Sequence, residues 1–211
     1  MTSACRVPSG FSPEAFESAI TAPLFPLRTP IAELPVGGYS PDWVERPRPA
    51  AVLLGITSGP GPGVVLTLRA RALQHHAGQV SFPGGARELP GESVVETALR
   101  EAREEAGIER HLVKPLGYLG RYDTISGYRM TAVVALLAEG ASLCPDCCEV
   151  DEVFTVPLTS VTDPDCYRHE KVRHAGRTFD IVTLDHPDHH IWGATAALLH
   201  EYGTRLGSLS G

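Results

Sequence analysis

The sequence has few of the features expected of a membrane protein, a secreted protein or a nucleic-acid-binding protein. No stretch approaches the roughly 18 consecutive apolar residues of a transmembrane helix. The N-terminus has no basic segment followed by an apolar one, so we expect no signal peptide and a cytoplasmic location, away from membranes. The formal net charge of −7 disfavours nonspecific binding to nucleic acid.

Lysine is also scarce, because arginine supplies 16 of the 18 basic residues. An anionic substrate would need local positive charge in so acidic a chain, and the planar fork of arginine suits phosphate.

Cysteine is present in an odd number, five in all, which together with the lack of a secretion signal predicts reduced thiols. Cys144, Cys147 and Cys148 form a C-x-x-C-C cluster, and Cys166 follows. A zinc site needs four ligands at suitable spacing, and no second pair supplies them, so we expect no zinc here. A histidine cluster near the end of the chain also lacks the spacing that completes a metal site. It consists of His186, His189 and His190.

The length of 211 residues suits one domain with an extension. Residues 1–47 contain eight prolines, which break any long element, although a short helix is predicted to begin at Pro13 after Ser12. We therefore predict a proline-rich extension over residues 1–47, laid over a domain at 48–207.

Within that domain, strand patterns alternate with two helical patterns. Strands are predicted at 49–57, 63–69, 79–82, 116–122, 130–137, 153–156, 167–172 and 178–183. The first two are expected to form a hairpin through 58–62, and the last two a hairpin through Ala175-Gly176. Helices are predicted at about 92–106 and 192–206, with a turn of helix at 158–161. This mixture favours an α/β or α+β sandwich.

The predicted helix at 92–106 is the most informative stretch. Its apolar residues form one stripe, and Gly107 stands where a helix end favours a left-handed residue. Glu101, Glu104 and Glu105 fall on the other side, within an arc of roughly 100°. Three carboxylates so close together repel each other. They form either an ordinary solvated helix face or a site for a hard divalent cation such as Mg²⁺ or Mn²⁺.

The segment 84–108 resembles the Nudix box, Gly-x5-Glu-x7-Arg-Glu-U-x-Glu-Glu-x-Gly-U, where U is aliphatic. All fixed positions from the first glutamate onward match, namely Glu92, Arg100, Glu101, Ala102, Glu104, Glu105, Gly107 and Ile108. Ala86 occupies the position of the first glycine, and Gly85 lies one residue before it. The resemblance implies the α/β/α sandwich with a mixed sheet of that family, and Mg²⁺- or Mn²⁺-dependent hydrolysis of a nucleoside-diphosphate-linked small molecule.

The resemblance also implies roles for individual residues. Glu101, Glu105 and Glu104 are the expected metal ligands, together with the carbonyl group of Gly85. Glu104 and Glu105 are candidate catalytic residues, and an acid from another loop is expected to activate the water or complete the site. Glu152 and Glu149 are the candidates for that acid. Arg100 is expected to pair with Glu92 and hold the loop onto the helix.

A second motif, Leu66 to Gly85, resembles the signature of the coenzyme A pyrophosphatase branch of the Nudix hydrolases, with Ala70 in place of the usual serine. The segments 149–158 and 191–196 resemble the same branch. The implied reaction cleaves coenzyme A or its thioesters into 3′,5′-ADP and a phosphopantetheine.

Basic residues within this second motif are candidates for substrate binding. Arg69 and Arg71 alternate at the end of a predicted strand, so both can face one side and bind phosphate bidentately. His75 and His76 could contact a phosphate or stabilise the loop. The alternative is that these are surface side chains without a binding role.

Two other functions fit parts of the sequence. The box alone is equally compatible with hydrolysis of ADP-ribose, NADH or nucleoside triphosphates. A non-catalytic Nudix-fold ligand-binding module is the second alternative, and the presence of all three box acids argues against it. A homodimer is an open alternative to a monomer.

Overall fold

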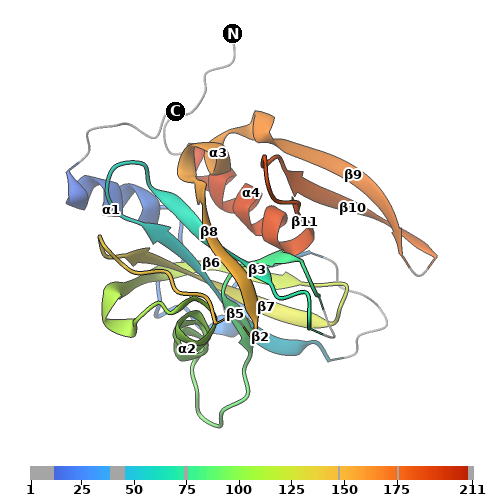
Figure 1. Ribbon diagram of the computed structural model, residues 1–211, viewed down its shortest axis with the longest axis horizontal. Coiled ribbons are helices and arrows are strands. Elements are labelled where there is room, and N and C mark those ends of the chain that lie inside the picture. The colour runs from blue at the N-terminus through green and yellow to red at the C-terminus, as the bar shows by residue number, and fades with distance from the viewer. Residues whose placement is uncertain (1–11, 39–45, 74–75, 147, 175, 209–211) are drawn as a thin grey trace.

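The computed structural model describes residues 12–38, 46–73, 76–146, 148–174 and 176–208. Its centre is a mixed sheet with the strand order β1-β6-β7-β2-β3-β4, in which β5 also pairs with β2 and β8 with β3 (Figure 1). These strands are β1 (Val36–Gly38), β2 (Arg48–Thr57), β3 (Gly63–Arg69), β4 (Val80–Ser81), β5 (Gly84–Ala86), β6 (Val113–Asp123), β7 (Tyr128–Leu137) and β8 (Val150–Pro157). β1 runs parallel to β6 and β2 parallel to β7, whereas the other pairs are antiparallel.

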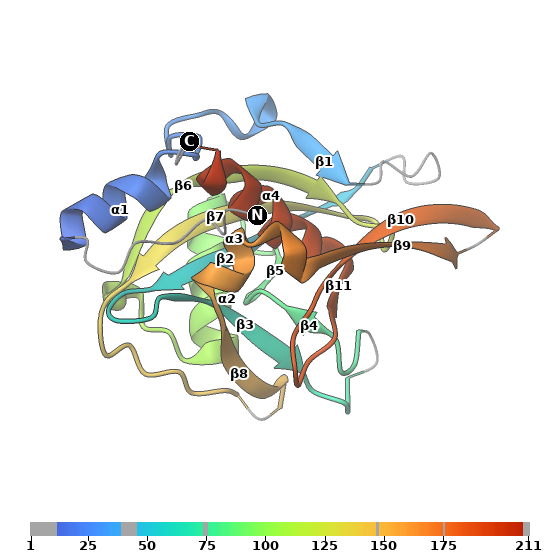
Figure 2. The ribbon, with the colours of Figure 1, turned by 90° about the horizontal axis from the view of Figure 1, so that it is seen from above.

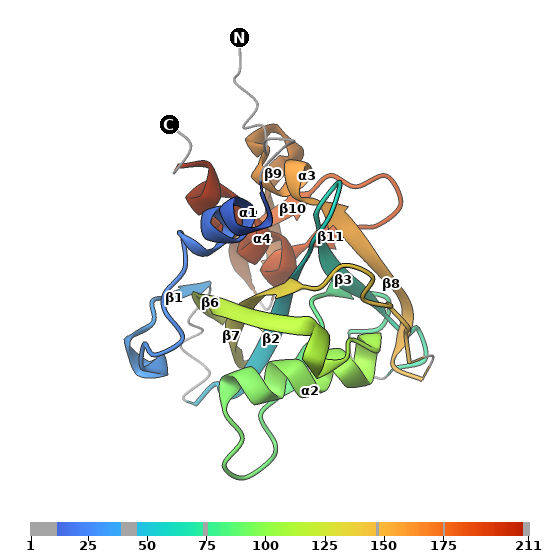
Figure 3. The ribbon, with the colours of Figure 1, turned by 90° about the vertical axis from the view of Figure 1, so that its left-hand side faces the viewer.

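Helices cover both faces of this sheet, which confirms the predicted α/β/α sandwich (Figure 3). α2 (Val94–Ala106) lies on one face, and α1 (Pro13–Thr21), α3 (Leu158–Thr162) and α4 (Gly193–Gly207) lie on the other. The sequence of strand β2 is almost continuously apolar because both faces of the strand are buried. Leu53 packs on the α2 side, and Leu54 packs on the α4 side.

The chain ends with a second, smaller sheet and α4. Its strands are β9 (Tyr167–His174), β10 (Arg177–Leu184) and β11 (Ile191–Trp192), and the β9–β10 hairpin projects from the body of the protein (Figure 2). The predicted antiparallel pairing of these two strands is confirmed, and Ala175 in their turn lies outside the described residues.

The other predicted hairpin, through residues 58–62, is only partly correct. β2 and β3 are antiparallel, but they share a single register pair, Ile56 with Val64, and then separate. β3 pairs along its whole length with β8 instead. The separation leaves the first half of β2 free to pair with β5, so that Ala51 stands opposite Gly85. The glycine-rich turn expected before α2 is therefore, in part, a sheet strand.

The proline-rich N-terminal segment contributes side chains to both cores. Ser12 caps α1, as expected, by accepting a hydrogen bond from the Ala15 N–H. Ile20 is buried on the α4 side, where its carbonyl accepts a hydrogen bond from the Tyr202 hydroxyl. Leu34 is buried on the α2 side.

None of the helices within the described ranges combines the length and the apolar character that crossing a bilayer requires.

Candidate active site

Local sequence fixes both ends of α2. Ser93 caps the first turn through a reciprocal pair of hydrogen bonds with Glu96. Gly107 ends the helix with a φ of 66°, a left-handed conformation in which a side chain would also meet the Cys144 carbonyl. The box acids are thereby held on a helix whose start and end are both defined.

Glu105 is buried, with its side chain only 2% exposed, so of the two alternatives left open for this helix face, an ordinary solvated face does not describe Glu105. One carboxylate oxygen accepts a hydrogen bond from Nη1 of Arg69 at 3.1 Å, and the other accepts from the Gly84 N–H at 3.0 Å. Burial raises the pKa of Glu105 to about 7, and the neighbouring charges of Glu101 and Glu149 add to the rise.

Glu101 lies directly against strand β5. A Cβ added to Gly85 would stand 2.5 Å from the nearer Glu101 oxygen, so any side chain at this position would displace the carboxylate from where it lies. Burial also raises the pKa of Glu101. The structure thus brings Gly85, rather than Ala86, against the box acids.

Arg100 connects the loop to the acids. Its Nε donates to Glu92 at 2.9 Å, which is the ion pair expected from the sequence, and its Nη1 donates to Glu101 at 2.8 Å and to Glu104 at 2.9 Å. The hydrogen bond from Arg100 is the main reason that the pKa of Glu92 is lowered. Glu104 is the most exposed of the box acids, at 56%.

The two candidates for the additional acid lie on different sides of the sheet. Glu149, just before β8, is close enough to raise the pKa of both Glu101 and Glu105, after the larger effect of burial. Glu152 stands opposite Leu68, which packs on the α4 side of the sheet. Its carboxylate lies 3.5 Å from Nε2 of His189, so the structure does not bring Glu152 to the box acids.

Comparison with known proteins decides the family, because the NUDIX domain model matches residues 46–175, more than half of the chain. This chain belongs to the Nudix family.

Relatives match over most of the same length. "Uncharacterized Nudix hydrolase NudL" from Photorhabdus laumondii is 40% identical over 162 residues, which cover 77% of this chain and 87% of that protein. The protein of the same name from Pectobacterium atrosepticum is 37% identical over 163 residues, 77% of this chain and 85% of its own. The solved Nudix hydrolase RenU from M. smegmatis is 29% identical with a TM-score of 0.44, over 54% of this chain and 73% of that one.

The basic candidates of the second motif do not form one group. Arg69, at the end of β3, forms an ion pair with Glu105. Its Nε is buried without a hydrogen-bond partner among the described residues. Arg71 is exposed, and its backbone N–H donates to Asp151 at 3.3 Å. His76 is exposed and contacts Gln79 at 2.8 Å, whereas His75 lies outside the described residues.

The structure treats the cysteine and histidine clusters of the sequence differently, because the cysteines occupy different surroundings whereas two of the histidines stack on each other. Cys144 and Cys148 are exposed, Cys166 packs against the core on the α4 side, and Cys147 lies outside the described residues. His189 stacks on Phe154 with ring centroids 3.9 Å apart. The remaining two histidines contact their neighbours: His186 stacks with His189, and His190 with Trp192.

The box acids fit a divalent cation by their chemistry. Within the described ranges, no three His, Cys, Asp or Glu side chains are already arranged around one metal position. Glu101 and Glu105 are, however, carboxylates of raised pKa that repel each other inside the protein, and the bare backbone of Gly85 lies directly against Glu101. Hard oxygen donors whose negative charge is only partly balanced by arginine suit Mg²⁺ or Mn²⁺.

Sequence reasoning missed three arginines, Arg87, Arg121 and Arg129, that line a cavity beside β5. They come from the β5–α2 loop, β6 and β7, so no local spacing connects them. The register of β6 with β7 brings Arg121 and Arg129 near each other, because it places Arg121 opposite Thr131 and Arg129 opposite Asp123.

Proposed function

We propose that this Nudix hydrolase is a metal-dependent pyrophosphohydrolase that cleaves coenzyme A or acyl-CoA at the diphosphate, giving 3′,5′-ADP and (acyl-)phosphopantetheine. The observation that carries the proposal is the position of Glu105. It joins the box helix to the coenzyme A-type motif through both of its oxygens, to Arg69 at one end of the motif and to Gly84 at the other.

This arrangement supports one continuous site. The motif that resembles the coenzyme A branch and the helix that carries the acids are hydrogen-bonded to each other, which supports the proposal that residues of both act on one reacting group. Substrate preference and hydrolysis would then depend on neighbouring side chains.

Roles for the chain's own residues follow from the geometry. We assign Glu101, Glu105 and Glu104, with the Gly85 carbonyl, to the binding of Mg²⁺ or Mn²⁺. When bound, a divalent cation supplies positive charge that neutralises the diphosphate and makes water more acidic. Arg100 orients Glu101 and Glu104 through its hydrogen bonds to both.

We assign the orientation or deprotonation of the attacking water to Glu149 rather than Glu152, because only Glu149 lies near the box acids. A carboxylate beside the reacting group can act as the general base that takes a proton from the attacking water. Arg69 holds Glu105 in place, and its buried Nε–H has no acceptor among the described residues.

The direct experiment is a hydrolysis panel with saturating Mg²⁺ or Mn²⁺. It contains coenzyme A, acetyl-CoA, 3′-dephospho-coenzyme A, ADP-ribose, NADH and a nucleoside triphosphate, and the products are identified by mass spectrometry. We expect 3′,5′-ADP from coenzyme A, with the highest kcat/KM for coenzyme A or its thioester. A higher kcat/KM for ADP-ribose, NADH or the triphosphate would refute the proposed substrate, and no hydrolysis of any would favour a binding module.

A further inference from the structure

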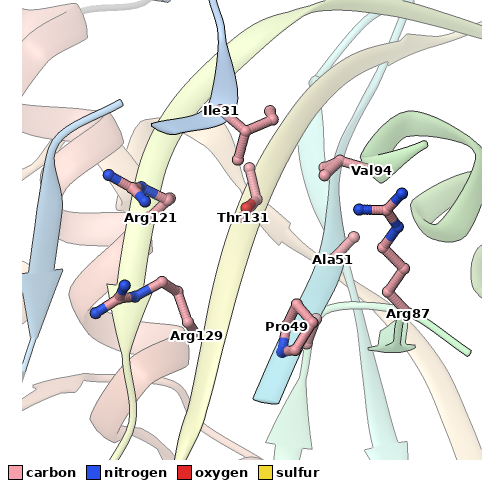
Figure 4. Close-up of a pocket in the computed structure, with 9 residues that line it drawn as sticks. Ile31, Pro49, Ala51, Arg87, Val94, Arg121, Arg129 and Thr131 are labelled. Atoms are coloured by element: carbon pink, nitrogen blue, oxygen red, sulfur yellow. The ribbon is translucent and has the colours of Figure 1, made fainter. Parts of the chain in front are cut away.

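The cavity beside β5 has a volume of about 220 Å³ and combines an apolar floor with arginine walls. Figure 4 shows Arg121 and Arg129 side by side on one wall and Arg87 on the opposite wall, near Val94. Pro49 and Ala51 lie between them. Among the described residues that line the cavity, none is acidic.

The charge of this cavity is only partly neutralised. Arg129 forms a two-pronged ion pair with the buried Asp123, with N–O distances of 2.7 and 2.6 Å. Among the described residues, Arg121 donates only to backbone carbonyls, those of Ala32 and Leu34, which carry no net charge. Two arginines, Arg121 and Arg87, therefore keep their full positive charge.

The Arg87 side chain is exposed at the rim of the cavity and makes no hydrogen bond or ion pair within the part of the chain that the structure describes. Its backbone N–H, in contrast, is fixed by the Pro49 carbonyl at 3.1 Å. The guanidinium is thus presented by an anchored backbone and has all its donors available, in a protein whose net charge is −7.

The cavity is next to the box acids. Its floor residue Ala51 pairs with Gly85, and Gly85 lies against Glu101. Val94, on its wall, is seven residues from Glu101 along α2, about 10 Å at the rise of an α-helix. A ligand whose diphosphate meets the acids can therefore place its next group in the cavity.

The volume limits what that group is. Pockets for a whole ligand measure about 300–1,000 Å³, so this cavity holds one end of a substrate. Arginine forks on two walls bind a phosphate through paired, charge-assisted hydrogen bonds, and the apolar floor packs against a sugar or base. A nucleotide that carries a second phosphate on its ribose supplies both the phosphate for the arginines and the sugar or base for the apolar floor.

We propose that the cavity lined by Arg87, Arg121 and Arg129 binds the 3′-phosphate end of the nucleotide, with Arg87 as a specificity-determining residue. This inference rests on the proposed function, and it assigns that phosphate to the cavity rather than to Arg69 and Arg71, the phosphate-binding candidates of the sequence. Arg69 is already engaged by Glu105, and Arg71 is not among the residues that line the cavity.

The test compares equilibrium binding of 3′,5′-ADP and 5′-AMP to the metal-free protein by calorimetry. Charge-assisted contacts predict that wild type binds 3′,5′-ADP about 10- to 150-fold more tightly. Arg87→Ala should bring this ratio close to one. Arg173→Ala, which removes an exposed arginine on β9, is the matched control and should keep the ratio. Thermal melting checks that both variants fold.

Equal binding of the two nucleotides by wild type, or an unchanged ratio in Arg87→Ala, would overturn the inference. The kcat/KM ratio for coenzyme A over 3′-dephospho-coenzyme A on the same proteins separates the two claims. Coenzyme A cleavage without an effect of Arg87 refutes the cavity's role and leaves the proposed function standing. Binding that depends on Arg87, without cleavage of coenzyme A, refutes the proposed substrate and supports the cavity.

Discussion

The two ends of α2 carry opposite chemistry. Toward its C-terminus, Glu101 and Glu105 are carboxylates of raised pKa that face β5, and at its N-terminus Val94 joins the wall of an arginine-lined cavity. The acidic end lies on one helix, so its spacing is visible in the sequence. The arginines of the basic cavity come from three separate segments of the chain, so the cavity becomes visible only in the folded protein. A local motif thus indicates where we propose that hydrolysis takes place, whereas long-range pairing of strands creates the cavity to which we assign substrate selection.

The largest effect is expected at the acidic end. Glu101→Gln and Glu105→Gln each remove a hard, charged ligand while keeping the shape of the side chain, so kcat should fall by about 10³-fold or more with the metal saturating. Glu109→Gln, an exposed acid just beyond α2, is the matched control and should retain wild-type kcat. Near-normal turnover in either box variant would place the metal ligands elsewhere.

The next effect distinguishes the two faces of the sheet. Glu149→Gln should lower kcat by about 10²-fold, the scale of general base catalysis, because Glu149 lies beside the box acids. Glu152→Gln, three residues along on the α4 side, should change kcat by less than about threefold. Steady-state kinetics of the pair check this, and the reverse ranking would show that Glu152 reaches the site.

A third prediction concerns the stability of the metal-free protein. Because the folded pKa of Glu105, about 7, exceeds the ordinary value of 4.5, its contribution to stability is full below about pH 4.5 and is lost as the pH rises through 7. This loss amounts to on the order of 3 kcal/mol of unfolding free energy. Glu105→Gln should lack this part of the pH dependence.

Urea unfolding in chelator at about pH 5 and pH 8 measures the effect, with Glu109→Gln as the control. If wild type and Glu105→Gln lose the same unfolding free energy between these two pH values, then burial does not disfavour the charge of Glu105. Adding Mg²⁺ at pH 8 should raise the unfolding free energy of the wild-type protein, and it should raise that of Glu105→Gln by a smaller amount.

The last prediction is that removal of zinc has no measurable effect. A zinc-selective chelator should change neither the melting temperature nor Mg²⁺-dependent activity, since Cys166 packs on the α4 side while Cys144 and Cys148 are exposed elsewhere. A drop in melting temperature would show that these thiols hold a structural zinc.

The sequence predicted the elements well where the pattern is local. The box helix, the β9–β10 hairpin and the capped helix at Pro13 all appear as expected. The Glu92–Arg100 ion pair was also predictable, because both residues belong to one motif.

Three features depend on contacts that periodicity does not encode. The separation of β3 from β2 follows from the pairing of β3 with β8, far along the chain. The burial of Glu105 depends on Arg69 and Gly84, which the helical wheel of α2 does not contain. The choice between Glu149 and Glu152 depends on the register of β8 with β3, which sends Glu152 to the other face.

The most direct test of the central claim is the product analysis of coenzyme A treated with the wild-type protein and Mg²⁺, alongside Glu105→Gln. The account predicts 3′,5′-ADP and phosphopantetheine in equal amounts from wild type, and almost none from the variant. Intact coenzyme A in the wild-type reaction, under conditions in which ADP-ribose or NADH is cleaved, would contradict it.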